Sequence, residues 1–151
     1  MPVSTKRAAK KTAVKKSTIQ IGLLDAIILG AQEKKAKDLV VMDLKSTGTS
    51  LADFFVVCHG DSSTQVDAIA HSIEDEVFKL LGERPSFREG FANAEWILLD
   101  YINIVVHVFL HEQREYYGIE RFWADAKTTA IGWTFLPYHC LLAVIVTILP
   151  H

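Results

Sequence analysis

The sequence predicts an α/β domain in which a mixed sheet of about five strands is flanked by helices. Short apolar runs rich in β-branched and aromatic residues alternate with segments whose apolar residues recur every three to four positions. Their order is helix, strand, strand, helix, short strand, hairpin and helices, which is typical of an α/β sandwich. The 151 residues, 50% of them hydrophobic, are enough to bury one core.

The first helix and the first strand follow a basic segment. Ile21, Leu24, Ile28 and Ala31 recur at helical spacing, and a serine or threonine at positions 17–18 can cap the helix. The apolar run 38–44 is bounded by charge and by the turn residues 45–49, so it predicts a strand.

The second strand and the second helix are joined by a short polar link. Residues 53–59 predict a buried strand, and residues 60–63 lead into a helix. Seven apolar residues form one stripe of this helix, namely Val66, Ile69, Ala70, Ile73, Val77, Leu80 and Leu81. Gly82 is expected to end the helix, and Pro85 prevents its continuation.

A short edge strand at 86–90 and a β-hairpin are expected next. The hairpin joins strands 96–100 and 104–110 through residues 101–103. Residues 111–117 and 120–126 then predict two short helices separated by Gly118.

The first hairpin strand offers a candidate binding surface. Side chains alternate across a strand, so Trp96, Leu98 and Asp100 share one face, and Tyr101 lies on the other with Ile97. An unpaired aspartate is rarely buried, which favours a partly solvated face. A tryptophan and a leucine beside a carboxylate on such a face suit a protein-binding patch. The alternative is that a helix covers Trp96 and that Asp100 only ends the strand.

The charge is unevenly distributed along the chain. Residues 1–16 contain six of the 16 basic side chains, whereas residues 17–151 carry 10 basic and 18 acidic side chains, a net charge of −8. We expect 1–16 to be a disordered arm that contacts phosphates. A solubilising tail and an organelle presequence are alternatives. Two cysteines and no secretory signal indicate a reducing, cytoplasmic location.

No catalytic, cofactor or metal site is predicted. The passage from Gly60 into a helix could cradle a phosphate, but Ser62 or Ser63 as a helix cap is the simpler interpretation. His107 and His111 are four residues apart, about 13 Å along a strand, which is too far for one zinc ion. His107 is therefore expected to be a core histidine with a hydrogen bond. Cys58 lies in an apolar run that raises the pKa of a thiol.

The C-terminal residues 133–151 contain no acidic side chain, lysine or arginine. A membrane span needs about 20 apolar residues, and the uninterrupted run 140–149 is shorter, so a span is not expected. An added strand or a homodimer contact built on 143–148 is favoured, and an altered gene end without a native role is the remaining alternative.

Seven sequence blocks occur in an order that resembles one family, the ribosomal silencing factors, also called Iojap-related proteins. The similarity extends over roughly residues 21–130, within a domain placed at 17–132. The blocks are Asp53-Phe-Phe, Gly60-Asp-Ser-Ser-Thr-Gln-Val66, Arg88-Glu-Gly90, Trp96-Ile-Leu-Leu-Asp-Tyr101, Val105-Val-His-Val-Phe109, Arg114-Glu-Tyr-Tyr117 and Glu120-Arg-Phe-Trp123.

The resemblance implies a nucleotidyltransferase-like fold without the catalytic acids. It also implies binding to protein fourteen of the large ribosomal subunit, which blocks joining of the small subunit and represses translation in starved cells. The contact residues that the resemblance implies are Trp96, Asp100 and Tyr101. Leu98, on the same strand face, and Asn103, just after them, complete the expected partner-binding set, and the basic arm could contact ribosomal RNA. The competing interpretation is a nucleotidyltransferase-like enzyme or a nucleotide-binding protein.

Two departures from the family pattern affect this expectation. Ile102-Asn103 replaces the usual Gly-Asp, which removes an acidic contact and a flexible turn residue. Thr64 stands where the family often has arginine, so the role of that arginine is not carried over.

Overall fold

The computed structural model describes residues 22–48 and 51–132. The basic arm, the expected cap at 17–18 and the apolar segment 133–151 lie outside these ranges. The predictions of a disordered arm, an added strand and a dimer contact therefore remain predictions.

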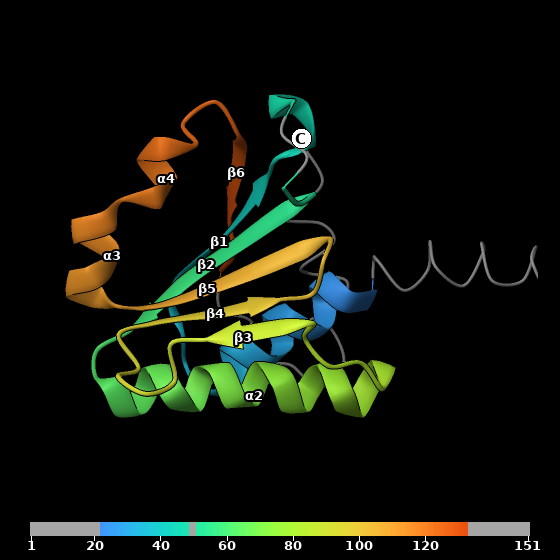
Figure 1. Ribbon diagram of the computed structural model, residues 1–151, viewed down its shortest axis with the longest axis vertical. Helices are drawn as coiled ribbons and strands as arrows, with labels where there is room; N and C mark the ends of the chain where they lie inside the picture. The colour runs from blue at the N-terminus through green and yellow to red at the C-terminus, as the bar shows by residue number, and fades with distance from the viewer. Residues whose placement is uncertain (1–21, 49–50, 133–151) are drawn as a thin grey trace, which may run out of the picture.

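A six-stranded mixed sheet forms the centre of the molecule, in the order β3-β4-β5-β2-β1-β6 (Figure 1). β2 and β5 are parallel, and all other neighbours are antiparallel. The mixed sheet confirms the predicted class, with one strand more than expected. The strands are β1 Lys37–Asp43, β2 Phe54–Gly60, β3 Phe87–Glu89, β4 Trp96–Asp100, β5 Ile104–Leu110 and β6 Lys127–Ala130.

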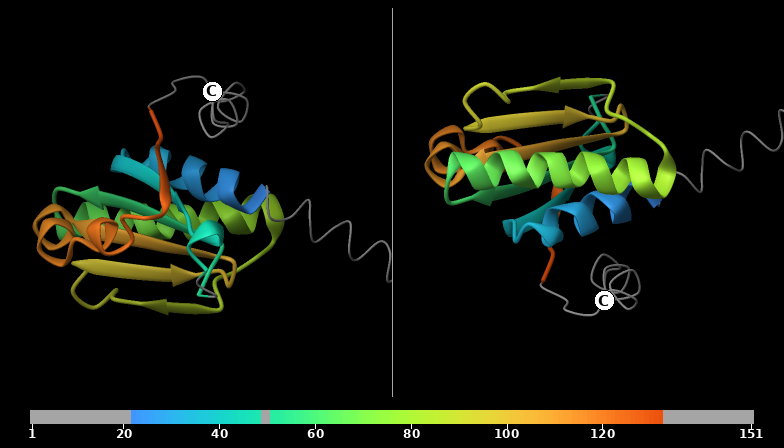
Figure 2. Two further views of the ribbon diagram at one scale, coloured as in Figure 1. Left: turned by 90° about the horizontal axis from the view of Figure 1, so that it is seen from above. Right: turned by 90° about the horizontal axis from the view of Figure 1, so that it is seen from below.

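Two helices pack on one face of the sheet. Residues 22–33 are helical, and α2 spans Ser63–Leu81 (Figure 2). They meet where the Ser72 hydroxyl donates to the Gly30 carbonyl at 2.7 Å. A Cβ atom at Gly30 would lie 2.6 Å from the Ile73 Cα atom, so only glycine permits this approach. The main core lies between these helices and the sheet.

The ends of α2 agree with the predicted signals. The Ser62 hydroxyl caps the helix by accepting from the Gln65 N–H at 3.1 Å. Gly82 adopts a left-handed φ of 68° and its N–H donates to the Phe78 carbonyl, as expected of a C-terminal glycine. The predicted apolar stripe is wrong at Leu80, which is exposed, whereas the next residue, Leu81, packs against the main core.

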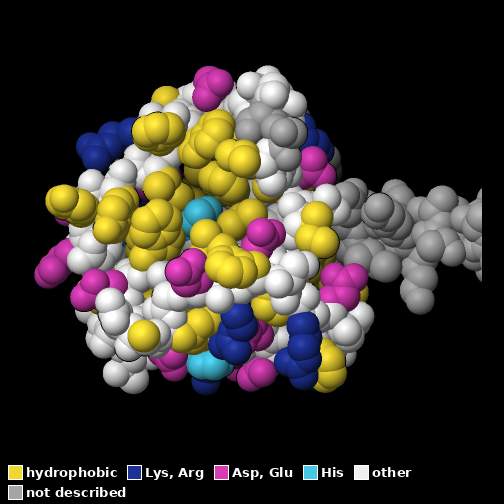
Figure 3. Space-filling view, in the orientation of Figure 1, with side chains coloured by type: hydrophobic (Ala, Val, Ile, Leu, Met, Phe, Trp, Pro, Cys, Tyr) yellow, Lys and Arg dark blue, Asp and Glu magenta, His cyan; other side chains and the backbone are white. Residues whose placement is uncertain are grey.

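A second, smaller cluster lies on the opposite face of the sheet. Three short segments follow the strands on this side, namely η1 Lys45–Thr47, α3 His111–Tyr117 and α4 Ile119–Phe122. Residues after β5 cover part of the face, where Trp123 packs edge-on against Phe55 at 5.9 Å. Hydrophobic side chains nevertheless gather at the surface of this side (Figure 3). We call it the open face and define it by Trp96, Leu98 and Asp100.

Candidate partner-binding surface

β4 has the alternating burial that its sequence predicts. The side chains of Ile97 and Leu99 point to the face of the sheet that α2 covers and are fully buried there. Trp96, Leu98 and Asp100 point to the opposite side and are only partly buried. The predicted solvated face therefore exists, and it combines two large apolar side chains with one carboxylate.

Trp96 is held in place by three neighbours. Its ring stacks on Phe109 at 4.9 Å and contacts Tyr117 of α3 at 4.8 Å. Its indole N–H donates to Nδ1 of His107 at 3.2 Å. Tyr117 thus covers one side of the ring, as the alternative interpretation had it, yet part of Trp96 remains accessible. The tryptophan is oriented before any partner binds, which lowers the entropy cost of binding.

Asp100 has a local structural role as well as an exposed position. Its Oδ1 atom accepts a hydrogen bond from the Ile102 N–H at 2.7 Å and so fixes the start of the hairpin turn. This agrees with the alternative that the aspartate ends the strand. The carboxylate still lies at the surface of the open face, so its charge acts on that face too.

The turn after β4 separates the two remaining predicted contact residues. Asn103 is half-buried, and its carbonyl accepts from the Asp53 N–H at 2.8 Å. Tyr101 does not share the surface: its side chain is 6% exposed and belongs to the main core on the side of α2. Burial raises the pKa of the Tyr101 hydroxyl. The proposed contact surface therefore excludes this side chain.

Strand pairing adds residues that sequence reasoning missed. Phe87 pairs with Asp100 and Glu89 pairs with Leu98, so both side chains extend the open face across β3. Phe87 is exposed although it is a large apolar residue. His107 pairs with Leu98 from the other side and lies at the centre of the face. The hairpin register alone could have placed His107 there.

A polar cluster lies at the end of the parallel strands β2 and β5. Buried Arg114 pairs with Glu120 and donates to the Asp38 carbonyl at 2.8 Å and to His59 Nδ1 at 2.9 Å. His59 Nε2 in turn lies 3.2 Å from Nδ1 of His111. A partner for His59 could not be named from the sequence, because Arg114 is 55 residues away. These residues border a pocket of about 570 Å³, but its buried arginine is engaged by the protein itself.

The residues that the sequence offers for phosphate binding or nucleophilic chemistry have structural roles instead. The Gly60 passage is capped by Ser62, and Gln65 Oε1 accepts from the Asp61 N–H at 2.8 Å. Cys58 is fully buried, and burial raises the pKa of its thiol to about 12. Among residues 22–48 and 51–132, no three His, Cys, Asp or Glu side chains form a metal-binding group.

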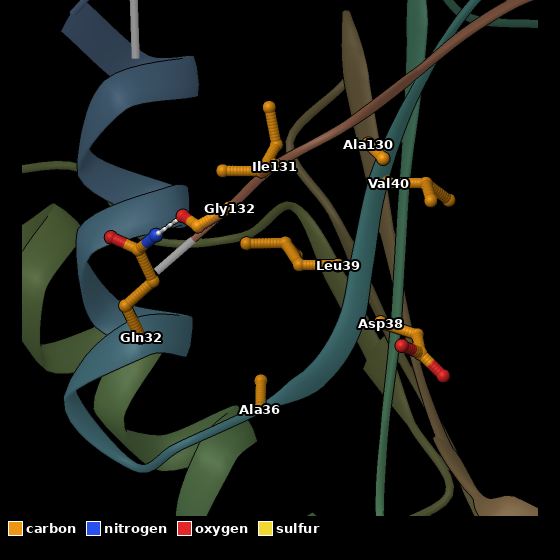
Figure 4. A pocket seen from close by; sticks show the side chains of 8 residues that line it. All are labelled: Gln32, Ala36, Asp38, Leu39, Val40, Ala130, Ile131 and Gly132. Atoms are coloured by element: carbon orange, nitrogen blue, oxygen red, sulfur yellow. Dashed lines mark hydrogen bonds between the residues drawn. The ribbon is translucent and has the colours of Figure 1, made fainter. Parts of the chain in front are cut away.

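A smaller pocket lies between the helix of residues 22–33 and the β1–β6 pair (Figure 4). Its volume is about 240 Å³, and Leu39 and Ile131 contribute apolar side chains. The Gln32 amide donates to the Gly132 carbonyl across it at 3.0 Å. In the described part of the chain, no helix is long and apolar enough to cross a membrane.

The sequence matches a family model described as "Ribosomal silencing factor during starvation" over residues 15–137. The chain belongs to the ribosomal silencing factor family. The match extends over most of the chain and includes every strand of the sheet and the whole open face.

Individual silencing factors support this assignment. The ribosomal silencing factor RsfS of Halalkalibacterium halodurans is 41% identical over 110 residues, which are 72% of this chain and 92% of that protein. RsfS of Bacillus subtilis is 40% identical over 71% of this chain and 89% of its own length. A crystal structure of a Chromobacterium violaceum protein is similar with a TM-score of 0.65 and 31% identity, covering 78% of this chain and 96% of that one.

Proposed function

We propose that this protein binds the large ribosomal subunit through its protein fourteen and blocks association with the small subunit. Translation would then fall in starvation or stationary phase. The family assignment supports a regulatory role at the ribosome. The observation that carries the proposal is the open face, where an oriented tryptophan, a leucine and a carboxylate are partly exposed on one strand.

The chemistry of the open face fits a basic, partly apolar partner. Aromatic side chains in partly desolvated patches often dominate protein interfaces. Asp100 and Glu89 place two carboxylates on the face, and the chain from residue 17 onward has a net charge of −8. Charge complementarity of this kind speeds association with a basic surface and selects against acidic ones.

We also propose that the protein acts by binding, without catalysing a reaction. Two backbone N–H groups at the start of α2 are bonded to side chains of the protein itself: that of Asp61 to Gln65 Oε1 and that of Gln65 to the Ser62 hydroxyl. The Cys58 thiol is buried with a raised pKa, which disfavours the reactive thiolate. Calorimetry with a nucleoside triphosphate and magnesium tests this point, and micromolar affinity would contradict it.

Sedimentation of the full chain with separated ribosomal subunits tests the proposed function. The protein should sediment with large subunits, and preincubation should reduce their association with small subunits. Trp96→Ala should weaken binding by a factor of about 30, since removal of an interface tryptophan costs about 2 kcal/mol. Asp100→Lys should weaken it as well by repelling a basic partner.

Matched variants on the opposite side of the molecule serve as controls. Leu80→Ala removes an exposed apolar side chain from α2, and Asp75→Lys makes the same charge change on that helix. Both should bind like the parent. If Trp96→Ala melted cooperatively and bound as tightly as the parent, the site would lie elsewhere. Loss of cooperative melting would instead show that Trp96 is needed for the core.

A further inference from the structure

We propose that His107 donates a hydrogen bond from Nε2 to a backbone carbonyl of the partner that docks on the open face. This inference rests on the proposed function and adds a residue that binds the backbone of the partner. It follows from the tautomer of the ring, its unpaired nitrogen and its place at the centre of the face.

The hydrogen bond with Trp96 fixes the tautomer of His107. An indole N–H only donates, so the His107 Nδ1 atom that lies 3.2 Å from it must be the acceptor. A neutral imidazole with an acceptor at Nδ1 carries its proton on Nε2. Burial lowers the pKa of His107 to about 4, so the ring is neutral at physiological pH. The His107 Nε2 atom is therefore a hydrogen-bond donor.

This donor has no acceptor among the residues that the structure describes. The His107 side chain is 5% exposed, and its Nε2 atom is buried without a hydrogen-bond partner. Buried polar groups are almost always paired, and a buried donor without an acceptor reduces stability. An unpaired donor at this position is explained if the partner supplies the missing acceptor.

The His107 ring lies on the side of the sheet that carries the open face. Side chains stand roughly perpendicular to a sheet, so the imidazole of His107 extends from β5 on the side of the open face. Leu98 pairs with His107 across the strands, and the Trp96 ring lies 6.0 Å from the His107 ring; both side chains are only partly buried. Nε2 is buried in the free protein, so its contact with the partner requires a side-chain rotation at the interface, a common change on binding, while Trp96 keeps its contacts.

The surroundings determine the kind of acceptor. Asp100 and Glu89 lie on the same face and would repel an anionic group. Phe55 packs against the His107 ring at 4.7 Å, so the immediate contact is apolar. A neutral backbone carbonyl, on a chain segment flanked by basic side chains, satisfies both conditions.

Two substitutions in the full chain test the inference against isolated protein fourteen of the large subunit. His107→Phe removes the donor and keeps a planar ring, so binding should weaken about tenfold, the effect of losing one hydrogen bond. His107→Gln places an amide donor near the position of Nε2 and should recover most of that loss. Thermal melting of each variant shows whether the effect on binding is separate from an effect on folding.

Nuclear magnetic resonance of the ring nitrogens gives a readout that needs no variant. The free protein should show a neutral ring protonated at Nε2, and this proton should shift downfield and exchange more slowly in the complex. Protonation at Nδ1 in the free protein would overturn the inference. An Nε2 proton whose chemical shift and exchange rate did not change on binding would also overturn it. This result is informative even if His107→Phe does not fold.

The outcomes separate this inference from the function on which it rests. If the parent chain binds and folded His107→Phe binds equally well, the role of His107 is refuted and the proposed function stands. If the parent chain does not bind protein fourteen, the proposed function and the role of His107 are both refuted.

Discussion

Ile102 occupies a backbone conformation that a β-branched residue rarely adopts. Its φ is 76°, in the left-handed region, and its side chain is exposed. The left-handed conformation costs a non-glycine residue about 1–2 kcal/mol. The hairpin tolerates the strain because Asp100 holds the Ile102 N–H and the strands on both sides are paired. The resemblance to the silencing factors places a glycine here in the usual pattern.

Ile102→Gly should therefore stabilise the protein. Relief of the strain outweighs the greater freedom of glycine in the unfolded chain, which leaves a net gain of about 0.5–1 kcal/mol. Urea denaturation measures the free energy of unfolding. Ile102→Val keeps the branched side chain and should leave the value nearly unchanged. A stability loss in Ile102→Gly would show that Ile102 contributes packing that outweighs its strain.

His107 should make the stability of the protein depend on pH. Burial lowers its pKa from 6.5 to about 4 in the folded state. Between these values the unfolded chain binds a proton and the folded chain does not, so stability falls as the pH decreases. Below pH 4 the free energy of unfolding is lower by about 3 kcal/mol, and above pH 6.5 the protonation of His107 no longer changes it.

Comparison with His107→Phe isolates this contribution. Other groups titrate in the same window: burial raises the pKa of Asp25 to about 6, which acts in the opposite direction as the pH decreases. The difference in melting temperature between parent and variant removes this shared background. It should change steadily between pH 6.5 and 4, in favour of the variant. Parallel pH curves would mean that the folded state accepts the His107 proton freely.

At the scale of elements, the contact between the two core helices depends on Gly30. Alanine normally stabilises a helix relative to glycine by about 1 kcal/mol. Here Gly30→Ala should destabilise the protein, because the new methyl group would lie 2.6 Å from the Ile73 Cα atom and 2.9 Å from the Ser72 carbonyl oxygen. We expect a loss of about 1–3 kcal/mol, typical of overpacking, measured by thermal melting.

Gly22 provides the control within the same helical segment. A Cβ atom there would meet only the end of the Leu81 side chain, at 3.4 Å. Gly22→Ala should therefore be neutral or mildly stabilising. If Gly30→Ala also melted at or above the temperature of the parent, the helices would not be in the close contact described.

Elements with strong local signals could be predicted from the sequence. The cap Ser62, the terminator Gly82 and the alternation along β4 are encoded within a few residues, and the structure agrees with each. β6 was missed because its Lys-Thr-Thr-Ala sequence has no apolar pattern and becomes a strand only through pairing with β1. The Arg114 cluster was missed for a related reason, since its partners are distant in the sequence.

The candidate site was predicted in part. Trp96, Leu98 and Asp100 follow from the period of a strand, which needs no knowledge of the fold. Phe87 required the register of β3 against β4, which a three-residue strand does not reveal. Tyr101 was placed on the correct face by alternation, but its burial depends on packing against the main core.

For the whole molecule, the separation of charge predicts a salt-dependent interaction. Residues 1–16 carry six basic side chains, whereas the remainder is acidic. If these side chains contact ribosomal RNA, binding releases counterions and weakens as salt increases. Deletion of residues 1–16 should flatten the plot of log affinity against log salt concentration for the large subunit. An unchanged slope would mean that the arm does not contact phosphates in the complex.

The parallel pair at the centre of the sheet has a consequence for how the chain folds during its own synthesis. β2 pairs with β1 on one side, but its other side pairs with β5, beginning with Phe54 opposite Ile104. The ribosome must therefore add residues 61–103 before the partner strand exists, which takes a few seconds at about 5–20 residues per second. During this interval an apolar strand has an unpaired edge beside the translating ribosome, and only the arrival of β5 closes it.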